Sequence, residues 1–324
     1  MAPATWALEK RRRRLSRHYE IVTEQRMEVL GHQPAEQRKS LLYRSLRAIE
    51  AQFLPHYYGD PPRWRMLARQ FGGTRTLPDF CLVGPCKAGT TDLAVSIMLH
   101  PNILPPIAKE FWAHGLQEWQ TYYPTEAERK KHTEAFGLSL SPYLMPSLHF
   151  MQVPYSLSRL KRNTKVVITL REPAERLFSH WKWELLLSGK GLARGLPFLS
   201  TFSAYVDKSL AVFPDFPMFT SCGLSGIAGS IYWEAVRYWI ECFGSENVLV
   251  LDSGDYFRDR NQFLHTIQDF VGLPRMSLPA NLKRINENPL PLPPPDAESM
   301  LKLRGFFRPY NEMLWVVMGK EFLW

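Results

Sequence analysis

The stretch from residue 80 to residue 99 constrains the fold of this chain more than any other part of its sequence. Residues 80–83 form a short, continuous apolar run that ends at Gly84, which is typical of a parallel strand buried on both faces. A loop of small and polar residues follows up to Thr91, and residues 92–99 have the pattern of a helix. A strand, a tight loop and a helix in direct succession indicate the first unit of an α/β fold.

The same succession recurs twice further along the chain. Residues 165–170 predict a second buried strand, and a helix is expected over 174–187. Residues 248–251 predict a third strand, followed by a helical stretch over 256–271. Strands that alternate with helices favour a three-layer α/β/α fold, in which helices cover both faces of a central parallel sheet. Ligands of such sheets bind beyond the carboxyl ends of the strands.

The N-terminal part of the chain differs from the rest in charge. The net charge is +9, and residues 1–75 account for +8 of it, with 15 Lys and Arg against 7 Asp and Glu. Weak helical periodicity over 1–58 and the Gly and Pro content of 59–78 predict a basic helical extension and linker over residues 1–78. The main domain would then span residues 79–324. The extension is either a solvated arm or a site for an acidic partner, such as membrane lipid, nucleic acid or a polyanionic glycan.

The loop after the first strand has the properties of an anion-binding site. Its small residues let backbone N–H groups approach an anion closely, and the following helix adds the positive end of its dipole. Lys87 adds a full positive charge, and Thr90 and Thr91 add hydroxyl donors. The loop is not a Walker A motif, because Lys87 lies two positions before Gly89 rather than directly after the last glycine.

Polar residues also follow the second predicted strand, where a ligand would bind. Arg171 comes directly after that strand, and Ser179 lies about two helical turns further on. A planar guanidinium together with a hydroxyl suits a phosphate monoester. Arg176 lies between them and is expected to be a structural residue of the helix.

Together, the two motifs resemble the cofactor-binding signature of the sulfotransferase superfamily, and their surroundings resemble its Golgi carbohydrate branch of heparan and chondroitin sulfotransferases. The resemblance extends over residues 79–324, since residues 229–243 and 306–324 also resemble segments of those domains. It implies a P-loop-like fold, the donor 3′-phosphoadenosine 5′-phosphosulfate (PAPS), the product adenosine 3′,5′-bisphosphate and no metal. The acceptor would be a carbohydrate hydroxyl or amine, or a small molecule, and no nucleic acid partner is expected.

The resemblance also implies roles for individual residues. The residues that would hold the 5′-phosphosulfate are Lys87, Ala88, Gly89, Thr90, Thr91 and Asp92. Arg171 and Ser179 would bind the 3′-phosphate. Lys283 and Arg284 would close the nucleotide pocket, in a segment that lacks the glycine usual in the family.

The reaction implied by the resemblance is a direct in-line transfer without a covalent enzyme intermediate. Lys87 would stabilise the negative charge that develops on the leaving phosphate, and Glu110 would take the proton from the acceptor. Glu110 matches the carboxylate of the family's Lys-Glu-x-His-Phe-Phe segment, but the usual His is missing, and His114 is the reserve candidate. Ser141 and Tyr143 are either pocket residues or part of a plain turn.

Two other functions stay open from the sequence. A P-loop kinase or NTPase would share the phosphate cradle and the parallel sheet, and the third strand is followed by Asp252 as a Walker B strand would be. A non-catalytic glycan-binding module on the same fold is favoured only by the altered base region.

The compartment stays open as well. No apolar run near the start is long enough for a signal peptide or a membrane span, which favours the cytoplasm, whereas the resemblance implies the Golgi lumen. The spacing of the four cysteines does not suit a zinc site. Cys222 and Cys242 would form a disulfide only in an oxidising compartment. The oligomeric state has no signature in the sequence.

Overall fold

The structure is a computed structural model of the chain. It describes residues 3–29, 37, 39–56, 60–111, 113, 115–192, 200–214, 219–220, 223–224, 226–285, 287–288 and 290–324.

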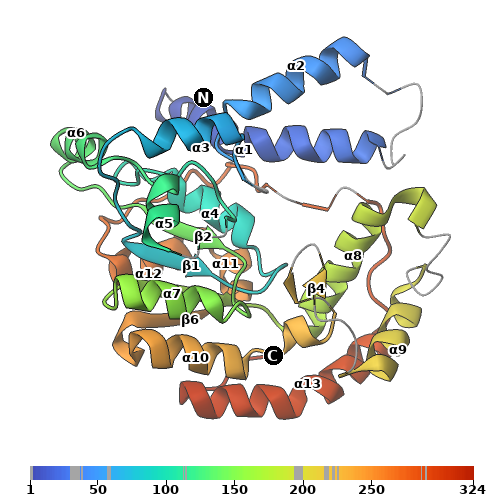
Figure 1. The fold of residues 1–324 in the computed structure, drawn as a ribbon. Coiled ribbons are helices and arrows are strands. Elements are labelled where there is room, and N and C mark those ends of the chain that lie inside the picture. Colours follow the sequence, from blue (N-terminus) through green and yellow to red (C-terminus); the bar gives the residue numbers. More distant parts are fainter. Residues whose placement is uncertain are drawn as a thin grey trace.

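A parallel sheet of four strands forms the centre of the molecule (Figure 1). In spatial order the strands are β2 (Pro142–Met145), β1 (Phe80–Val83), β3 (Lys165–Leu170) and β6 (Val248–Asp252). All three neighbouring pairs are parallel. The strands predicted at residues 80–83, 165–170 and 248–251 are therefore confirmed, and the fold is of the predicted α/β class.

Helices cover both faces of this sheet, which gives three layers (Figure 1). The helices are α1 (Pro3–Val29), α2 (Leu41–Gln52), α3 (Arg63–Gln70), α4 (Thr90–Met98), α5 (Leu116–Tyr122), α6 (Glu126–Phe136), α7 (Gln152–Leu160), α8 (Pro173–Leu192), α9 (Phe202–Val212), α10 (Trp233–Phe243), α11 (Ser253–Arg258), α12 (Arg260–Val271) and α13 (Ala297–Met318). A two-stranded antiparallel pair, β4 (Phe219–Thr220) with β5 (Gly223–Leu224), lies apart from the main sheet.

Alternate residues of the strands feed two separate hydrophobic cores, as the two-residue period of a strand requires. Cys81 and Val83 of β1 point into a core that α7 and α10 close. Phe80 and Leu82 point to the other face, into a core that α4 and α12 close. The central strand β1 is therefore buried on both faces, which explains its uninterrupted apolar sequence.

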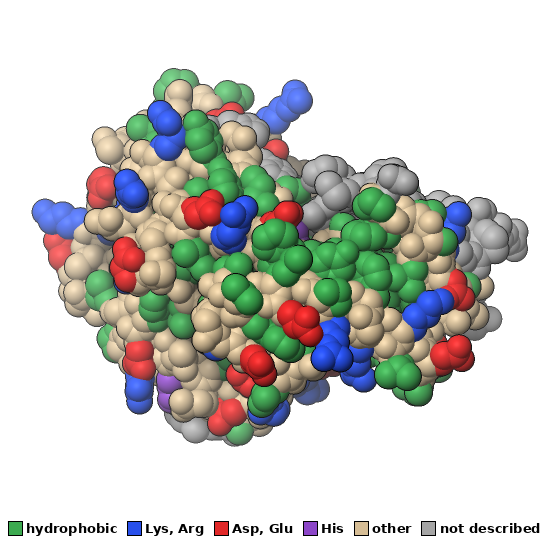
Figure 2. Space-filling model, turned by 90° about the horizontal axis from the view of Figure 1, so that it is seen from below, with side chains coloured by type: hydrophobic (Ala, Val, Ile, Leu, Met, Phe, Trp, Pro, Cys, Tyr) green, Lys and Arg blue, Asp and Glu red, His purple; other side chains and the backbone are tan. Residues whose placement is uncertain are grey.

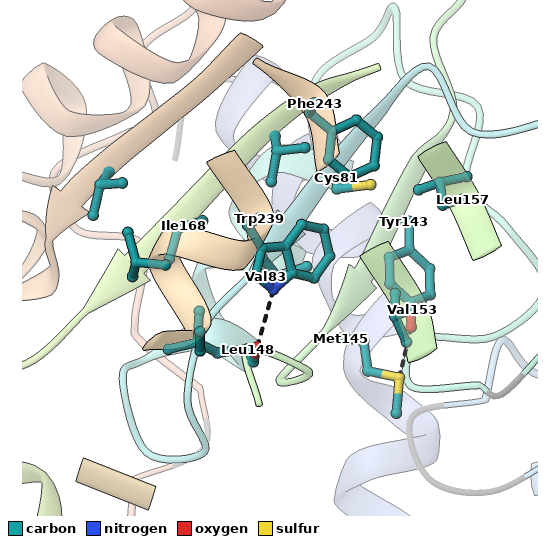
Figure 3. Packing of buried hydrophobic residues seen from close by; sticks show 14 of the residues in the cluster. Cys81, Val83, Tyr143, Met145, Leu148, Val153, Leu157, Ile168, Trp239 and Phe243 are labelled. Carbon is teal, nitrogen blue, oxygen red and sulfur yellow. Dashed lines mark hydrogen bonds between the residues drawn. The ribbon is translucent and has the colours of Figure 1, made fainter. Parts of the chain in front are cut away.

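The core under α10 is organised around a buried tryptophan (Figure 3). Trp239 packs beside Phe243, and its indole N–H donates to the carbonyl of Leu148 at 2.9 Å. Tyr143 lies in the same core and donates to the sulfur of Met145 at 2.8 Å. Both polar groups have partners, so these large amphipathic rings can be buried without an unpaired donor.

Two helix predictions differ from the structure. The stretch expected to be helical over 256–271 consists of α11 and α12, which meet at Asp259. The carboxylate of Asp259 accepts from the N–H of Gln262, so Asp259 caps α12 and the chain changes direction there. The predicted linker over 59–78 contains the helix α3.

The basic N-terminal helix is docked on the molecule rather than solvated. Leu15, Tyr19 and Ile21 of α1 are buried, and α1 contacts α4 and α8. The guanidinium of Arg11 donates to the carbonyl of Ile103 at 3.1 Å. The interpretation of the extension as a free arm is therefore wrong for α1, whereas the boundary between residues 78 and 79 stays a prediction.

The face that carries α10 and α13 is mixed in character. Figure 2 shows hydrophobic side chains on this face, interspersed with Lys, Arg, Asp and Glu side chains. Met313 and Val316 of α13 are among the exposed apolar residues. Within the described ranges, no helix has both the length and the apolar character needed to cross a membrane. Cys242 is a free thiol, and Cys222 lies outside the described residues.

Candidate functional site

The loop between β1 and α4 requires two glycines for its shape. A Cβ atom at Gly84 would lie 2.5 Å from the carbonyl oxygen of Thr169 on the neighbouring strand, so any larger residue would push β1 and β3 apart. Gly89 is the N-cap of α4 with a φ of 75°, in the left-handed region. Its ideal Cβ would also lie 3.0 Å from the ring of Phe257. These constraints turn the loop tightly at the carboxyl end of β1.

Helix α8 holds this loop from the other side. The buried guanidinium of Arg176 donates to the carbonyl of Cys86 at 2.9 Å and to the carbonyl of Gly226 at 2.7 Å. The guanidinium of Arg171 donates to the carbonyl of Lys87 at 3.3 Å. The two sequence motifs are therefore joined directly, and Arg176 has the structural role expected of it.

A cavity of about 330 Å³ opens where the loops after β1, β3 and β6 meet. Its lining residues are Tyr19, Lys87, Gly89, Asp92, Arg171, Ser179, Lys182, Trp183, Leu186, Phe257, Arg284, Ile285, Glu287 and Asn288. Six of the predicted site residues thus come together: Lys87, Gly89, Asp92, Arg171, Ser179 and Arg284. The volume is that of a small-molecule site, and the position matches the ligand-binding edge of parallel sheets.

Positive charge converges on this cavity. The ammonium group of Lys87 lies 4.0 Å from the ring centroid of Trp183, over its face. Burial lowers the pKa of Arg171, and burial together with the charge of Arg171 lowers the pKa of Lys182. Burial holds both cations away from water, and Lys182 also lies close to the charge of Arg171, so a bound anion would favour the charged forms of both.

The remaining loop residues are buried rather than part of the cavity wall. Ala88 precedes the N-cap of α4, and Thr90 and Thr91 begin its first turn. The first N–H groups of a helix have no acceptor within the helix, so this turn presents donors to an anion. The assignment of these residues to a phosphosulfate rests on the backbone and stays a prediction.

Asp92 fixes the late segment that covers the cavity. One carboxylate oxygen accepts from the N–H of Ile285 at 2.8 Å. The other accepts from the hydroxyl of Tyr256 at 2.6 Å and from the guanidinium of Arg260 at 3.3 Å. Both oxygens are therefore occupied by protein donors, which gives Asp92 a positioning role at the cavity edge.

The two late basic residues lie on different cavities. Arg284 lines the cavity of Lys87, with its guanidinium over the ring of Phe257 and a hydrogen bond to the carbonyl of that residue at 2.7 Å. Lys283 instead lines a second cavity of about 790 Å³, between α1, α2 and residues 281–283. The expectation that both residues close one pocket therefore agrees with the placement of Arg284 only.

Glu110 lies beside the cavity rather than in its wall. Its carboxylate forms an ion pair with the buried Lys109, and its N–H donates to the carbonyl of Leu144 at 2.9 Å. The charge of Glu110 also contributes to the pKa of Tyr19, which does line the cavity. His114, the reserve base, lies outside the described residues.

Backbone conformation singles out the two predicted catalytic residues. Among the described residues other than glycine, positive φ angles occur at Lys87 (76°) and Glu110 (63°). A side chain in this region costs on the order of 1 kcal/mol or more and persists only where the surroundings enforce it. Such strain concentrates at functional sites, which is an observation independent of the motifs.

Ser141 and Tyr143 are core residues. The hydroxyl of Ser141 donates to the carbonyl of Leu104 at 2.7 Å, and Tyr143 is buried in β2. Neither residue lines the cavity of Lys87. The alternative of a plain turn is also wrong for Tyr143, because Pro142 begins a strand that pairs with β1.

Sequence reasoning missed several residues of the cavity wall. Lys182, Trp183 and Leu186 follow Ser179 at intervals of three, four and seven residues, so they share one face of α8. That periodicity was a usable signal once Ser179 had been chosen. Tyr19 had no such signal, because it lies far away in the sequence.

Asp252, which stands where a Walker B aspartate would stand, forms structural contacts instead. One carboxylate oxygen of Asp252 caps α11 by accepting from the N–H of Gly254 at 2.7 Å. The other accepts from the indole N–H of Trp324 at 2.8 Å. Asp252 does not line the cavity, so its geometry gives no support to a kinase or NTPase.

Comparisons with known proteins agree with this geometry. A family model described as the sulfotransferase domain matches residues 77–288. The human heparan sulfate glucosamine 3-O-sulfotransferase 3B1 is 21% identical over 274 residues, which cover 78% of this chain and 66% of that protein. The bifunctional heparan sulfate N-deacetylase/N-sulfotransferase 1 of Caenorhabditis elegans is 25% identical over 230 residues, which cover 66% of this chain and 24% of that protein.

A solved structure with the same fold is a sulfotransferase from Alicyclobacillus acidocaldarius. It aligns with a TM-score of 0.51 at 20% identity, and the alignment covers 76% of this chain and 98% of that one.

The chain spans slightly less than two thirds of the length of the human relative and a much smaller share of the nematode relative.

Proposed function

The chain belongs to the sulfotransferase domain family, and on that premise we propose that it transfers a sulfuryl group from PAPS to a carbohydrate hydroxyl or amine. The observation that carries the proposal is the meeting of Lys87, Arg171 and Ser179 in one cavity at the carboxyl ends of β1 and β3. These are the residues that the family resemblance assigns to the two ends of the donor.

The chemistry of the cavity supports a nucleotide with two anionic groups as its occupant. Four cationic side chains, Lys87, Arg171, Lys182 and Arg284, lie on the wall together with the helix N-terminus of α4. The rings of Trp183 and Phe257 offer apolar faces suitable for an adenine or a ribose. PAPS, as the donor substrate, brings the sulfuryl group and the leaving phosphate.

Different residues of the chain have different roles in the transfer. Lys87 stabilises the negative charge that grows on the bridging oxygen as the bond between sulfur and this oxygen breaks. Arg171 and Ser179 bind the 3′-phosphate and so fix the donor in line with the acceptor. Glu110 takes the proton of the acceptor hydroxyl as the new bond between sulfur and oxygen forms.

The proposed acceptor class rests on the relatives. Two of them carry heparan sulfate in their names, one as an O-sulfotransferase and the other as an N-sulfotransferase. We therefore propose a glycosaminoglycan-like glycan as the acceptor of this chain. The N-terminal basic residues along α1 are compatible with a polyanionic chain, since net positive charge attracts such substrates.

Calorimetric titration tests the cofactor directly. The protein is titrated with adenosine 3′,5′-bisphosphate and, separately, with ATP, each with and without Mg²⁺. We expect tight binding of the bisphosphate that does not depend on the metal, and weak binding of ATP. Binding of ATP only with Mg²⁺, together with no binding of the bisphosphate, would contradict the proposal in favour of a P-loop kinase or NTPase.

A further inference from the structure

The wall of the cavity includes a residue from outside the matched family domain. Every lining residue from Lys87 to Asn288 falls within residues 77–288, whereas Tyr19 belongs to α1. Tyr19 is 7% exposed, so α1 holds its ring firmly against the cavity. The active-site cavity is therefore completed by the N-terminal helix.

The docking of α1 makes this contribution a fixed one. Leu15 lies one turn before Tyr19, and both residues belong to the hydrophobic core that also contains Leu93 of α4. Arg11 ties the same helix to the carbonyl of Ile103 at 3.1 Å. A residue held on a rigid helix by such contacts can position a substrate group accurately.

The phenol of Tyr19 is placed to donate a hydrogen bond. Burial raises its pKa, and the negative charge of Glu110 adds to the rise. The hydroxyl therefore stays protonated at neutral pH. A hydrogen bond with the side chain of Thr23, one turn further along α1, lowers the pKa of the phenol and offsets part of that rise.

Tyr19 lies near both proposed catalytic residues, Lys87 and Glu110. Its side chain lines the cavity that contains Lys87. It also lies close enough to Glu110, the proposed base, for the charge of that carboxylate to act on it. In an in-line transfer the acceptor oxygen must lie between the base and the sulfur, so Tyr19 borders the place that the acceptor occupies.

We propose that Tyr19 contacts the acceptor, as a hydrogen-bond donor supplied by the N-terminal helix to the transfer site. This proposal rests on the sulfotransferase function proposed above. It assigns α1 a share in acceptor recognition and makes this helix part of the working enzyme rather than an appendage.

The variant Tyr19→Phe tests the contact, because it keeps the ring that packs against α4 and removes only the hydroxyl. Steady-state transfer from PAPS to heparan sulfate is measured together with the calorimetric Kd for adenosine 3′,5′-bisphosphate. We expect kcat/KM for heparan sulfate to fall about tenfold, as for the loss of one hydrogen bond in a binding site. The Kd for the bisphosphate should change by less than about twofold.

Tyr43→Phe is the matched control, since Tyr43 lies on α2 and donates to Glu24 at 3.4 Å without lining the cavity. This variant should behave as the unmodified protein. Thermal melting of both variants shows whether the fold is intact, and a residue that only anchors α1 would lower the melting temperature without changing kcat/KM.

Two outcomes would overturn the inference alone. One is an unchanged kcat/KM in Tyr19→Phe while the unmodified protein is active. The other is a parallel loss of affinity for the bisphosphate, which would place Tyr19 at the nucleotide instead. A different outcome, in which the unmodified protein neither binds the bisphosphate nor transfers sulfate to heparan sulfate, would overturn the proposed function and this inference with it.

Discussion

At the scale of single residues, the site depends on side chains that occupy costly positions. Lys87 and Glu110 have positive φ angles, and Arg171 and Arg176 carry guanidinium groups into the interior around the cavity. Each of these arrangements is unfavourable by itself. The proposed function accounts for the positions of Lys87, Glu110 and Arg171, whereas Arg176 is buried because it holds the loop between β1 and α4.

Arg171 and Arg176 are predicted to behave differently on substitution. Arg171→Ala should raise the Kd for adenosine 3′,5′-bisphosphate about 10- to 100-fold, because a charge-assisted contact to a phosphate is lost. The measurement is calorimetric titration. Arg308→Ala, on the exposed side of α13, is the control and should leave the Kd unchanged. An unaltered affinity in Arg171→Ala would remove Arg171 from the 3′-phosphate site.

Arg176→Met should act on stability. The substitution leaves the buried carbonyl of Cys86 and the partly buried carbonyl of Gly226 without the donor that they have in the native protein. We expect the free energy of unfolding to fall by about 3 kcal/mol, measured by urea denaturation. Arg237→Met, at an exposed position on α10, should change it by less than about 0.5 kcal/mol. Equal stabilities of the two variants would show that Arg176 does not hold the loop.

At the scale of elements, the docking of α1 brings two histidines together in the interior. The rings of His18 on α1 and His56 after α2 are 4.2 Å apart at their centroids. Burial, followed by the charge of His56, lowers the pKa of His18 to about 4. Burial, followed by the charge of Arg65, lowers the pKa of His56 to about 4. Both rings are therefore neutral in the folded protein at neutral pH.

Acid should weaken this docking. Because both folded pKa values lie below the ordinary value of 6.5, the unfolded chain binds more protons between about pH 6.5 and 4, and stability falls as the pH drops through that window. Each histidine should lower the free energy of unfolding by on the order of 1 kcal/mol for each pH unit within that window. Urea unfolding at pH 7.5 and pH 5 should give a smaller pH dependence for His18→Phe than for the unmodified protein. An identical dependence would contradict the burial of His18.

The helices and strands show which features could be predicted from the sequence and which could not. The strands at residues 80–83 and 165–170 and the loop between β1 and α4 were predictable, because their signals are local and continuous. Strand β2 was missed, since Pro142 at its start has the appearance of a turn. The break at Asp259 was missed as well, because an aspartate N-cap inside an apolar pattern leaves no Gly or Pro to mark it.

At the scale of the whole molecule, long-range packing decides what the sequence pattern leaves open. The basic charge of residues 1–75 suggested a free arm, but three apolar side chains on α1 dock it beside the cavity. The contribution of Tyr19 follows from that docking and could not be predicted from spacing, because it depends on which faces meet after the sheet is assembled. Six predicted residues do line the cavity, since the carboxyl ends of parallel strands converge on one edge.

The measurement that tests the whole account most directly is sulfuryl transfer from radiolabelled PAPS to heparan sulfate by the unmodified protein and by Lys87→Ala. Lys302→Ala, which removes an exposed lysine of α13, is the control. We predict incorporation of label by the unmodified protein and by the control. For Lys87→Ala we predict a kcat lower by at least about a hundredfold, because the leaving oxygen loses its stabilising charge. The circular dichroism spectrum of this variant should be unchanged. Near-normal turnover by Lys87→Ala would contradict the account.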